Sequence, residues 1–215
     1  MGSVTTSRPY RSALREQQAE QTRELIAAAA RARFLEKGWS GTSVRSVAAE
    51  AGVSEATIYA VYGSKAGLAS SLIDAAEQRA DVRRAVAELE QHAGDPLAQL
   101  GVLVAFDRRL YEVGGDVLRL AGEARRQHPD LAAAFDDGRR RGDTVRAKVF
   151  GGWPGTVWRA DVDVEKARSV YALLVSLEAY DVATSERGWT PEQIERWWHA
   201  SLAELLLADG LGRER

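Results

Sequence analysis

The sequence contains no cysteine, and its three histidines, His92, His128 and His199, lie far apart along the chain. Disulfides, zinc–thiolate centres and cysteine nucleophiles are therefore excluded, which fits a reducing compartment. A His-Glu-x-x-His motif, a glycine-rich nucleotide loop and a Gly-x-Ser-x-Gly motif are missing as well. We therefore expect neither a catalytic site nor a metal site.

Long hydrophobic runs and a leader are also missing. The sequence contains no run of about 18 apolar residues, the length that a helix needs to cross a bilayer. Residues 1–18 also lack the apolar centre of a signal peptide. We expect a cytoplasmic protein with no membrane partner and no cofactor.

Proline is scarce, with five residues in 215, whereas helix-forming alanine, leucine, glutamate and arginine recur throughout. Alternating β-branched residues bounded by turn residues, which would predict strands, do not stand out. The expected fold class is all-α.

Positive charge is concentrated near the N-terminus. Residues 1–65 carry nine Lys or Arg and six Asp or Glu, a net charge of +3, whereas the rest of the chain has a net charge of −5. Such a division suits a phosphate-rich partner at one end, although many proteins that bind no nucleic acid share it.

Helix-start and helix-stop residues divide the chain. A polar arm is expected over residues 1–19, and the first four helices are expected near 21–37, 43–51, 54–62 and from 65 onward. Beyond residue 82, helices are expected near 96–111, 116–127, 130–150, 164–184 and 190–208. Gly114 and Gly115 are expected to separate the first two of these, and residues 151–163 form the longest irregular stretch.

The segment Thr42–Lys65 carries most of the functional information. Two short helical patterns meet across Ala51-Gly52-Val53, where Gly52 permits a tight turn and Val53 fills the space between the helices. A helix-turn-helix of this kind inserts its second helix, here Ser54–Tyr62, into the major groove of DNA.

Residues 22–76 resemble the TetR family of transcriptional regulators. The matching pieces are Ile26, Ala29, Ala30 and Phe34 in the first helix, followed by Lys37–Trp39, Thr42–Ala48, Ala51–Ser54, Thr57–Tyr59 and Tyr62–Lys65. They follow one another without gaps and cover about a quarter of the chain.

The resemblance implies which residues contact double-stranded DNA. Thr42, Ser43, Tyr62 and Lys65 would hold phosphates, and Arg45 would reach the backbone or a base edge. The exposed face of the recognition helix would consist of Ser54, Glu55, Ala56, Thr57, Tyr59 and Ala60. Glu55 departs from the family, which commonly has a basic or neutral residue at this position. A carboxylate there opposes phosphate, although it could accept a hydrogen bond from a cytosine amino group.

The resemblance also implies a homodimer with a small-molecule effector. It places a DNA-binding domain at 20–80 and a larger ligand-sensing and dimerisation domain at 83–215. The candidate ligand contacts are Phe106, Arg109, Tyr111, Trp153, Trp158, Tyr171 and Glu178. Glu178 would be a lone carboxylate on an apolar helix, and Arg109 would be its ordinary partner.

Two apolar helices near the C-terminus would form the dimer interface, with a four-helix bundle across the two-fold axis. Their apolar faces comprise Val170, Leu173, Leu174 and Leu177 on one helix, and Ile194, Trp197, Trp198, Leu202, Leu205 and Leu206 on the other. The alternative is that both faces belong to the core of one chain.

The sequence therefore predicts a ligand-responsive transcriptional regulator, most simply a repressor released from its operator by a small molecule. The alternative is a helical ligand-binding or interaction module without sequence-specific DNA binding, favoured by Glu55 and by the few polar groups on the recognition helix. Arg8, Arg11 and Arg15 would form either a solvated arm or a minor-groove contact.

Overall fold

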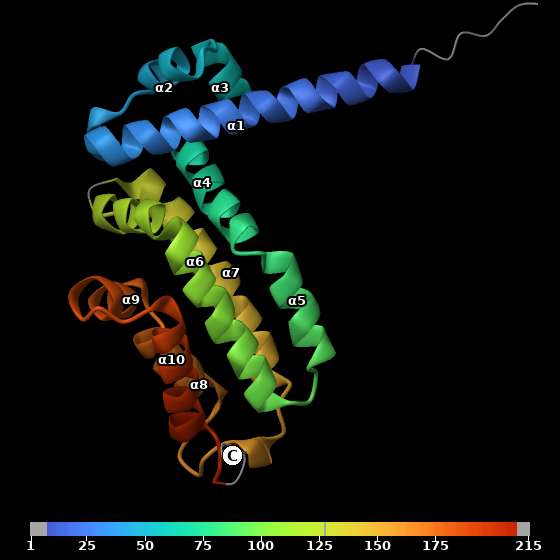
Figure 1. The fold of residues 1–215 in the computed structure, drawn as a ribbon, viewed down its shortest axis with the longest axis vertical. Coiled ribbons are helices and arrows are strands. Elements are labelled where there is room, and N and C mark those ends of the chain that lie inside the picture. Colours follow the sequence, from blue (N-terminus) through green and yellow to red (C-terminus); the bar gives the residue numbers. More distant parts are fainter. Residues whose placement is uncertain (1–7, 127, 210–215) are drawn as a thin grey trace, which may run out of the picture. The chain divides into compact units, whose positions relative to one another are not determined.

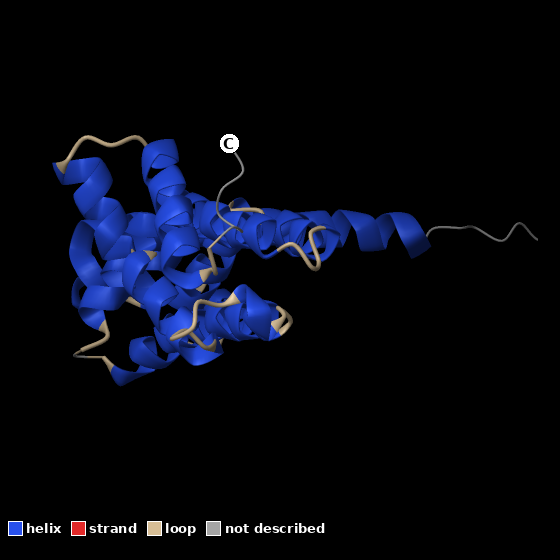
Figure 2. Cartoon of the chain, turned by 90° about the horizontal axis from the view of Figure 1, so that it is seen from below, coloured by secondary structure: helices blue, strands red, loops and turns tan. Residues whose placement is uncertain are grey.

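The computed structural model describes residues 8–126 and 128–209, with the backbone alone at residues 8–14 and 134. Within these ranges the chain consists of helices joined by turns, without a named strand (Figure 2). The expectation of an all-α fold is confirmed. The chain forms two compact units that divide between Leu72 and Ile73, inside the helix that we expected to end the DNA-binding domain near residue 80.

Four helices build or begin in the N-terminal unit (Figure 1). They are α1 (Arg8–Gly41), α2 (Val44–Ala51), α3 (Glu55–Tyr62) and α4 (Lys65–Arg79), whose second half belongs to the C-terminal unit. The bounds of α2 and α3 agree with the cap residues read from the sequence, because Ser43 and Ser54 each accept a hydrogen bond at a helix start.

The start of α1 differs from expectation. Residues 1–7 of the predicted arm lie outside the described residues, but from Arg8 onward the backbone is helical. Pro9 is tolerated in a first turn, and the Ala, Glu, Gln and Arg residues that follow are strong helix formers. The expected stop is confirmed, because Gly38 has φ 67° and breaks the helix.

The core of the N-terminal unit lies where α1 meets the two short helices. Ile26, Ala30 and Phe34 recur every four residues on the buried side of α1. The Phe34 ring stacks on Trp39 with centroids 5.3 Å apart. Ile58, which has no exposed surface, anchors α3 to this core, so the other faces of α3 are left for solvent or a partner.

Helix α6 is the centre of the C-terminal unit. It packs against α5, α7, α9 and α10, while α8 packs on α7 and α10. The bounds are α5 (Val82–Gln91), α6 (Pro96–Ala124), α7 (Pro129–Gly151), α8 (Val164–Leu174), α9 (Leu177–Asp181) and α10 (Pro191–Leu206), with a 3₁₀ turn at Gly155–Val157 and a π-helical turn at Val182–Glu186. The capping box of Thr190 and Gln193 opens α10 as its sequence predicts.

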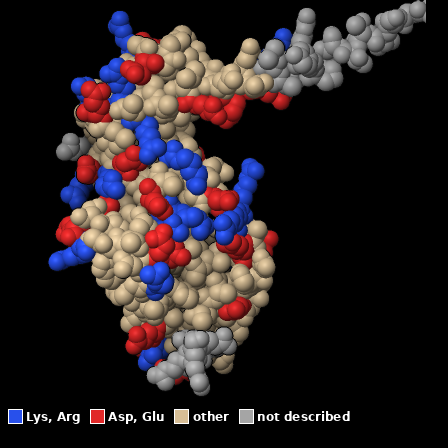
Figure 3. All heavy atoms as spheres, in the orientation of Figure 1, with Lys and Arg blue, Asp and Glu red and all other residues tan. Residues whose placement is uncertain are grey.

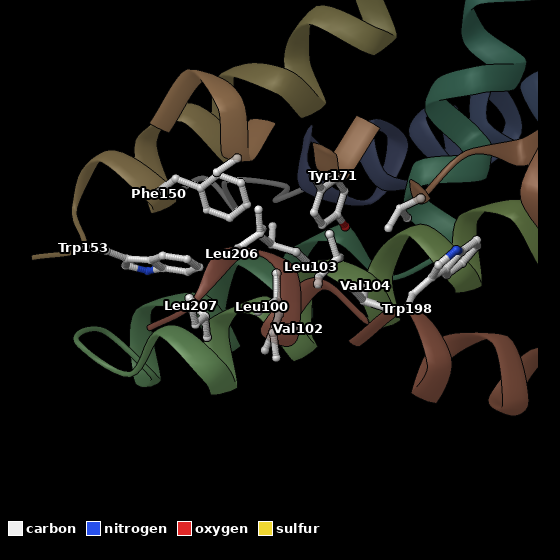
Figure 4. Close-up of a cluster of buried hydrophobic side chains, with 14 of the residues drawn as sticks. Leu100, Val102, Leu103, Val104, Phe150, Trp153, Tyr171, Trp198, Leu206 and Leu207 are labelled. Carbon is white, nitrogen blue, oxygen red and sulfur yellow. The ribbon is translucent and has the colours of Figure 1, made fainter. Parts of the chain in front are cut away.

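Aromatic side chains fill much of the core of this unit (Figure 4). The Phe150 ring lies 4.8 Å from Trp153, and Trp153 lies 5.0 Å from Trp158, centroid to centroid. The indole nitrogen of Trp153 donates to Gln99 Oε1 at 2.7 Å, which satisfies both buried groups.

Two helix boundaries in this unit were predicted wrongly. Helix α6 continues through Gly114 and Gly115 and is not divided there. Gly114 serves close packing against α4, since a Cβ at this position would come within 2.6 Å of Ala76 Cβ. The predicted helix 164–184 is instead broken at Val175-Ser176. Ser176 caps α9, and Tyr111 donates its hydroxyl to the freed carbonyl of Val175 at 3.1 Å.

Charged side chains of both signs are interspersed on the face seen in Figure 3. Many charged side chains of the described residues form ion pairs within a helix or between helices, such as Arg119 with Asp181 and Arg108 with Glu195. Among the described helices, none is both long and apolar enough to span a membrane.

Candidate nucleic-acid interface

The turn between α2 and α3 depends on glycine. Gly52 adopts the left-handed conformation (φ 67°, ψ 29°), and its N–H donates to carbonyls of the last turn of α2. Val53 N–H donates to Ala48 O at 3.0 Å, and Thr57 N–H donates to Ser54 Oγ at 3.1 Å. Successive caps therefore fix the direction in which α3 leaves the turn.

The outer face of α3 is accessible. Glu55, Ala56 and Ala60 are exposed, and Tyr59 retains 49% of its surface. Thr57 is half-buried, with its hydroxyl 2.8 Å from Ser54 Oγ. The predicted recognition face therefore lies on the surface of the N-terminal unit.

Three predicted backbone contacts lie beside this face. Ser43 is exposed at the start of α2, and the exposed Arg45 has no ion pair within the described part of the chain. Tyr62 is half-buried, and burial raises the pKa of its hydroxyl, which keeps it a neutral donor. These positions provide one cation, Arg45, and two neutral hydroxyl donors.

Thr42 differs from the expectation that it holds a phosphate. The residue is 3% exposed, and its hydroxyl lies 2.9 Å from the carbonyls of both Arg33 and Gly38. Its side chain therefore fixes the end of α1 against the start of α2 and is not accessible to a phosphate in this conformation.

Lys65 is also engaged inside the unit. Its ammonium donates to the carbonyl of Trp39 and lies 4.2 Å from the centroid of the Trp39 ring. Partial burial lowers the pKa of Lys65. Lys65 therefore ties the start of α4 to the end of α1, which the sequence alone did not indicate.

Arg33 was noticed only as a departure from an apolar position. Its guanidinium pairs with Glu50 at 2.6 Å and so joins α1 to α2. At least four cations of the N-terminal segment thus have partners inside the unit, namely Arg23, Arg33, Lys37 and Lys65. Arg45 is an exposed cation near α3 that has no ion pair within the described residues.

Most of the predicted ligand contacts are core residues. Trp153, Trp158 and Tyr171 are buried, and Phe106 and Tyr111 pack against the same cluster. Glu178 is exposed, which corrects the expectation of a lone carboxylate in apolar surroundings. Arg109 does not pair with it, because its Nε donates to Ala80 O at 3.0 Å.

Sequence reasoning missed a buried polar cluster formed by α6, α7 and α8. Asp107 is 7% exposed and accepts a hydrogen bond from the Tyr171 hydroxyl at 2.8 Å. Burial raises the pKa of Asp107, opposed by the nearby Arg146 guanidinium and the bond from Tyr171. Arg146 Nη1 lies 3.5 Å from Asp107 Oδ2. Only the pairing of three helices shows that these groups meet.

A groove of about 400 Å³ lies beside this cluster, between α7 and α8. It is lined by Asp136, Arg139, Arg140, Asp143, Arg146, Glu165, Arg168, Ser169 and Ala172. None of the predicted ligand contacts lines it. Within the described residues, no group of His, Cys, Asp and Glu is arranged to hold a metal ion.

The second half of α4 is bonded to neighbouring helices of the C-terminal unit. Arg141 of α7 pairs with Asp74 at 2.7 Å and with Glu77 at 3.0 Å. Arg79 donates to Val113 O at 2.9 Å. Since α4 begins in the N-terminal unit, these bonds hold the one helix that belongs to both units.

The apolar faces near the C-terminus divide between core and surface. Ile194, Trp198, Leu202 and Leu206 are buried in the core of one chain, so their assignment to the dimer interface was wrong. Leu173 is 79% exposed, and Trp197 and Leu205 are exposed on α10. These three residues are therefore among the large apolar side chains that the described part of the chain leaves exposed.

A sequence profile described as "Bacterial regulatory proteins, tetR family" matches residues 26–72. The match covers the second half of α1, all of α2 and α3, and the start of α4. No curated protein matches the chain by sequence.

Solved structures with similar folds cover most of the chain. NalD of Pseudomonas aeruginosa, described as the secondary repressor of the MexAB-OprM multidrug efflux pump, has a TM-score of 0.70 and 20% identity over 88% of this chain and 99% of its own. A protein of Saccharomonospora viridis, described as a transcriptional regulator in complex with choline, has a TM-score of 0.67 and 20% identity over 88% and 99%. FadR of Bacillus subtilis, in complex with stearoyl-CoA, has a TM-score of 0.65 and 15% identity over 84% and 97%.

Proposed function

We propose that this chain, whose residues 26–72 match the profile of the tetR family, is a transcriptional regulator that binds an operator as a homodimer and is released by a small molecule. The accessible face of α3 carries the proposal. Ile58 is buried and holds α3 against the core, while Tyr59 and the small residues Ala56 and Ala60 are exposed. A helix that reads the major groove needs such an accessible outer face.

The composition of that face favours contacts to the edges of bases by shape and by methyl groups. Ala56 and Ala60 offer apolar contact to thymine methyls, and Glu55 offers an acceptor for a cytosine amino group. Ser43, Arg45 and Tyr62 would hold the backbone and set the register of α3. Specificity would then depend on few hydrogen bonds.

Dimer formation is supported by the exposed apolar residues of the C-terminal unit. Leu173, Trp197 and Leu205 would be covered by the same residues of a second chain, since a two-fold axis pairs a patch with itself. A dimer would present two α3 helices to half-sites about 34–36 Å apart.

The release by a ligand is supported by relatives of the same fold. Choline and stearoyl-CoA are bound by two of the similar structures, and NalD is described as a repressor. In this chain a ligand would act through the second half of α4, which Arg141 and Arg79 bond to the C-terminal unit. It would shift the balance between two conformations only by its different affinity for each.

The proposal is tested by fluorescence anisotropy with a duplex from upstream of the protein's own gene, against a scrambled duplex of equal length. Affinity for both should fall steeply between about 50 and 200 mM salt, and the natural duplex should bind more tightly at each concentration. Light scattering should give a dimer of the 23.5 kDa chain. Trp197→Glu should dissociate it, whereas Val86→Glu, at an exposed apolar residue of α5, should not.

A second candidate function is a ligand-binding or interaction module without sequence-specific DNA binding. The internal bonds of Thr42 and Lys65 and the exposed Glu55 favour it. Equal, weak affinity for the natural and scrambled duplexes at every salt concentration would support the module and contradict the regulator.

A further inference from the structure

The groove between α7 and α8 contains charges that the fold does not use fully. Arg168 forms ion pairs with both Asp143 and Glu165, and Asp136 lies 3.4 Å from Arg125. The acidic residues of the lining are therefore engaged. Arg139 has no ion pair within the described residues, although it lines the groove.

Arg146 lies at the inner wall of the groove with donors to spare. Its side chain is 16% exposed, and its contacts to carboxylates are long: 3.5 Å to Asp107 and 4.0 Å to Asp143. Its Nε, the atom 4.0 Å from Asp143, is buried and has no hydrogen-bond partner within the described residues. A guanidinium offers five N–H donors in one plane, so a largely desolvated arginine with these contacts is incompletely paired.

The surroundings of Arg146 keep its guanidinium in place. It lies over the Tyr171 ring, 5.1 Å from the centroid. A Cβ at position 142 would lie 3.3 Å from both of its terminal nitrogens, so Gly142 leaves the space that the guanidinium occupies. On the facing helix, Ser169 and Ala172 are small, which leaves the groove open.

We infer that this groove binds a small organic anion, whose carboxylate or phosphate is received by Arg146 and Arg139. A volume of about 400 Å³ is in the range of small-molecule sites. Planar oxyanions match the geometry of guanidinium donors, and a partly desolvated site strengthens each charge-assisted bond. The inference deepens the proposed function, on which it rests, because the groove would be the effector site.

A chain of ion pairs joins the groove to α4. Arg140 lines the groove and donates to Asp137 at 2.6 Å. Asp137 also accepts a bond from Arg141, the residue that holds Asp74 and Glu77 of α4. An anion that attracts Arg140 would break its bond to Asp137, so that Asp137 would pair with Arg141 alone. The bonds from Arg141 to α4 would then change.

The test is thermal unfolding of the full-length protein with four probes of similar size: benzoate, phenyl phosphate, benzyl alcohol and benzyltrimethylammonium. Ionic strength is held constant with chloride. A ligand that binds only the native state raises Tm, and the stabilisation grows with the logarithm of one plus the ratio of ligand concentration to Kd. The two anions should raise Tm, and the neutral and cationic probes should not.

Variants locate the site. Arg139→Gln, at an exposed position that folding does not require, should weaken binding of the anion about tenfold, and Arg146→Gln should weaken it further, because a charge-assisted bond is lost in each. Arg83→Gln, at an exposed arginine of α5, is the matched control and should bind as the wild type does. The stronger of the two anions identifies the ligand as a carboxylate or a phosphate.

Equal anion shifts in wild type, Arg139→Gln and Arg83→Gln would overturn the inference, as would a larger shift with the cation or none with either anion. DNA affinity is measured separately for each variant. Operator binding without anion binding contradicts the groove alone, whereas anion binding without operator binding contradicts the proposed function alone.

Discussion

The two surfaces proposed to bind ligands, the outer face of α3 and the groove between α7 and α8, use charge in opposite ways. Around α3, the cations Arg33 and Lys65 are bound to groups of their own unit, and the exposed face consists mostly of small and aromatic side chains. Between α7 and α8, arginines crowd one groove, and Arg139 and Arg146 are incompletely paired. The comparison teaches that the sign of a segment's net charge does not locate its binding surface.

The reason lies in what each surface must do. A helix that is to enter a groove of DNA needs a fixed direction, so the internal bonds that hold α1, α2 and α4 together would serve the proposed readout. A groove for a small anion needs donors that the fold leaves available, and it holds them at the cost of incomplete pairing. The comparison therefore makes different predictions for charges on the two surfaces.

The largest expected effect comes from the support of α3. Phe34→Ala removes a buried ring that stacks on Trp39, and it should lower the free energy of unfolding by about 3–5 kcal/mol. Chemical denaturation measures the loss. Leu25→Ala, at an exposed leucine of the same helix, is the control and should change stability by less than about 0.5 kcal/mol. Equal losses would mean that the stack does not support the unit.

A smaller effect should distinguish a cation that stabilises the N-terminal unit, Lys65, from one that contacts DNA, Arg45. Lys65→Met should lower the free energy of unfolding by about 1–3 kcal/mol, because the charged donor to the Trp39 carbonyl is lost. Arg45→Ala should leave stability unchanged and reduce the salt dependence of DNA binding by about one charge. Denaturation and anisotropy on both variants decide. The reverse assignment would contradict the comparison of internal and exposed cations.

Direct readout by α3 should appear at single base positions. Thr57→Ala should relax preference at one base pair, at a cost of about 1–3 kcal/mol, if its methyl or hydroxyl contacts that base. The measurement is affinity for a set of operator variants changed one base pair at a time. Uniform losses over the whole set would assign Thr57 to the support of α3, where its hydroxyl meets Ser54.

The most modest prediction concerns Asp107, which faces Arg146 and Tyr171. Burial raises its pKa above the ordinary value of 3.8, so the folded state keeps a proton that the unfolded state has lost in the interval between the two pKa values. Stability should therefore fall as pH rises through that interval. Relative to the wild type, Asp107→Asn should lack this fall in denaturation at a series of pH values. Parallel profiles would show that the carboxyl is not held neutral.

Local features of the fold were predictable from the sequence. Ser43, Gly52, Ser54 and Thr190 act within a turn of their own positions, so their roles follow from neighbouring residues. Gly114 was misread as a break because its role depends on Ala76, far away in sequence. The interruption at Val175 was missed for the same reason, since its carbonyl is satisfied by Tyr111 of another helix.

For the candidate sites, too, contacts between residues far apart in the sequence could not be predicted. The outward face of α3 was expected from the resemblance to the TetR family, but the inward bonds of Thr42 and Lys65 were not. Asp107 and Arg146 carry no local signal, because an acid and a base on separate helices become a site only when the helices pack. Tyr171 was noticed for its aromatic ring, whereas its hydroxyl bond to Asp107 proved more informative.

The contact between Gly114 and Ala76 has a mechanical consequence. Helices that meet through bulky side chains interlock as ridges and grooves and settle in separate positions. A surface made of a hydrogen and a methyl group is smooth, so a small slide of the second half of α4 along α6 displaces few atoms. The polar bonds at the edges of that half-helix, from Arg79 to Val113 O and from Arg109 to Ala80 O, would then help the buried Ile73 to set its resting position.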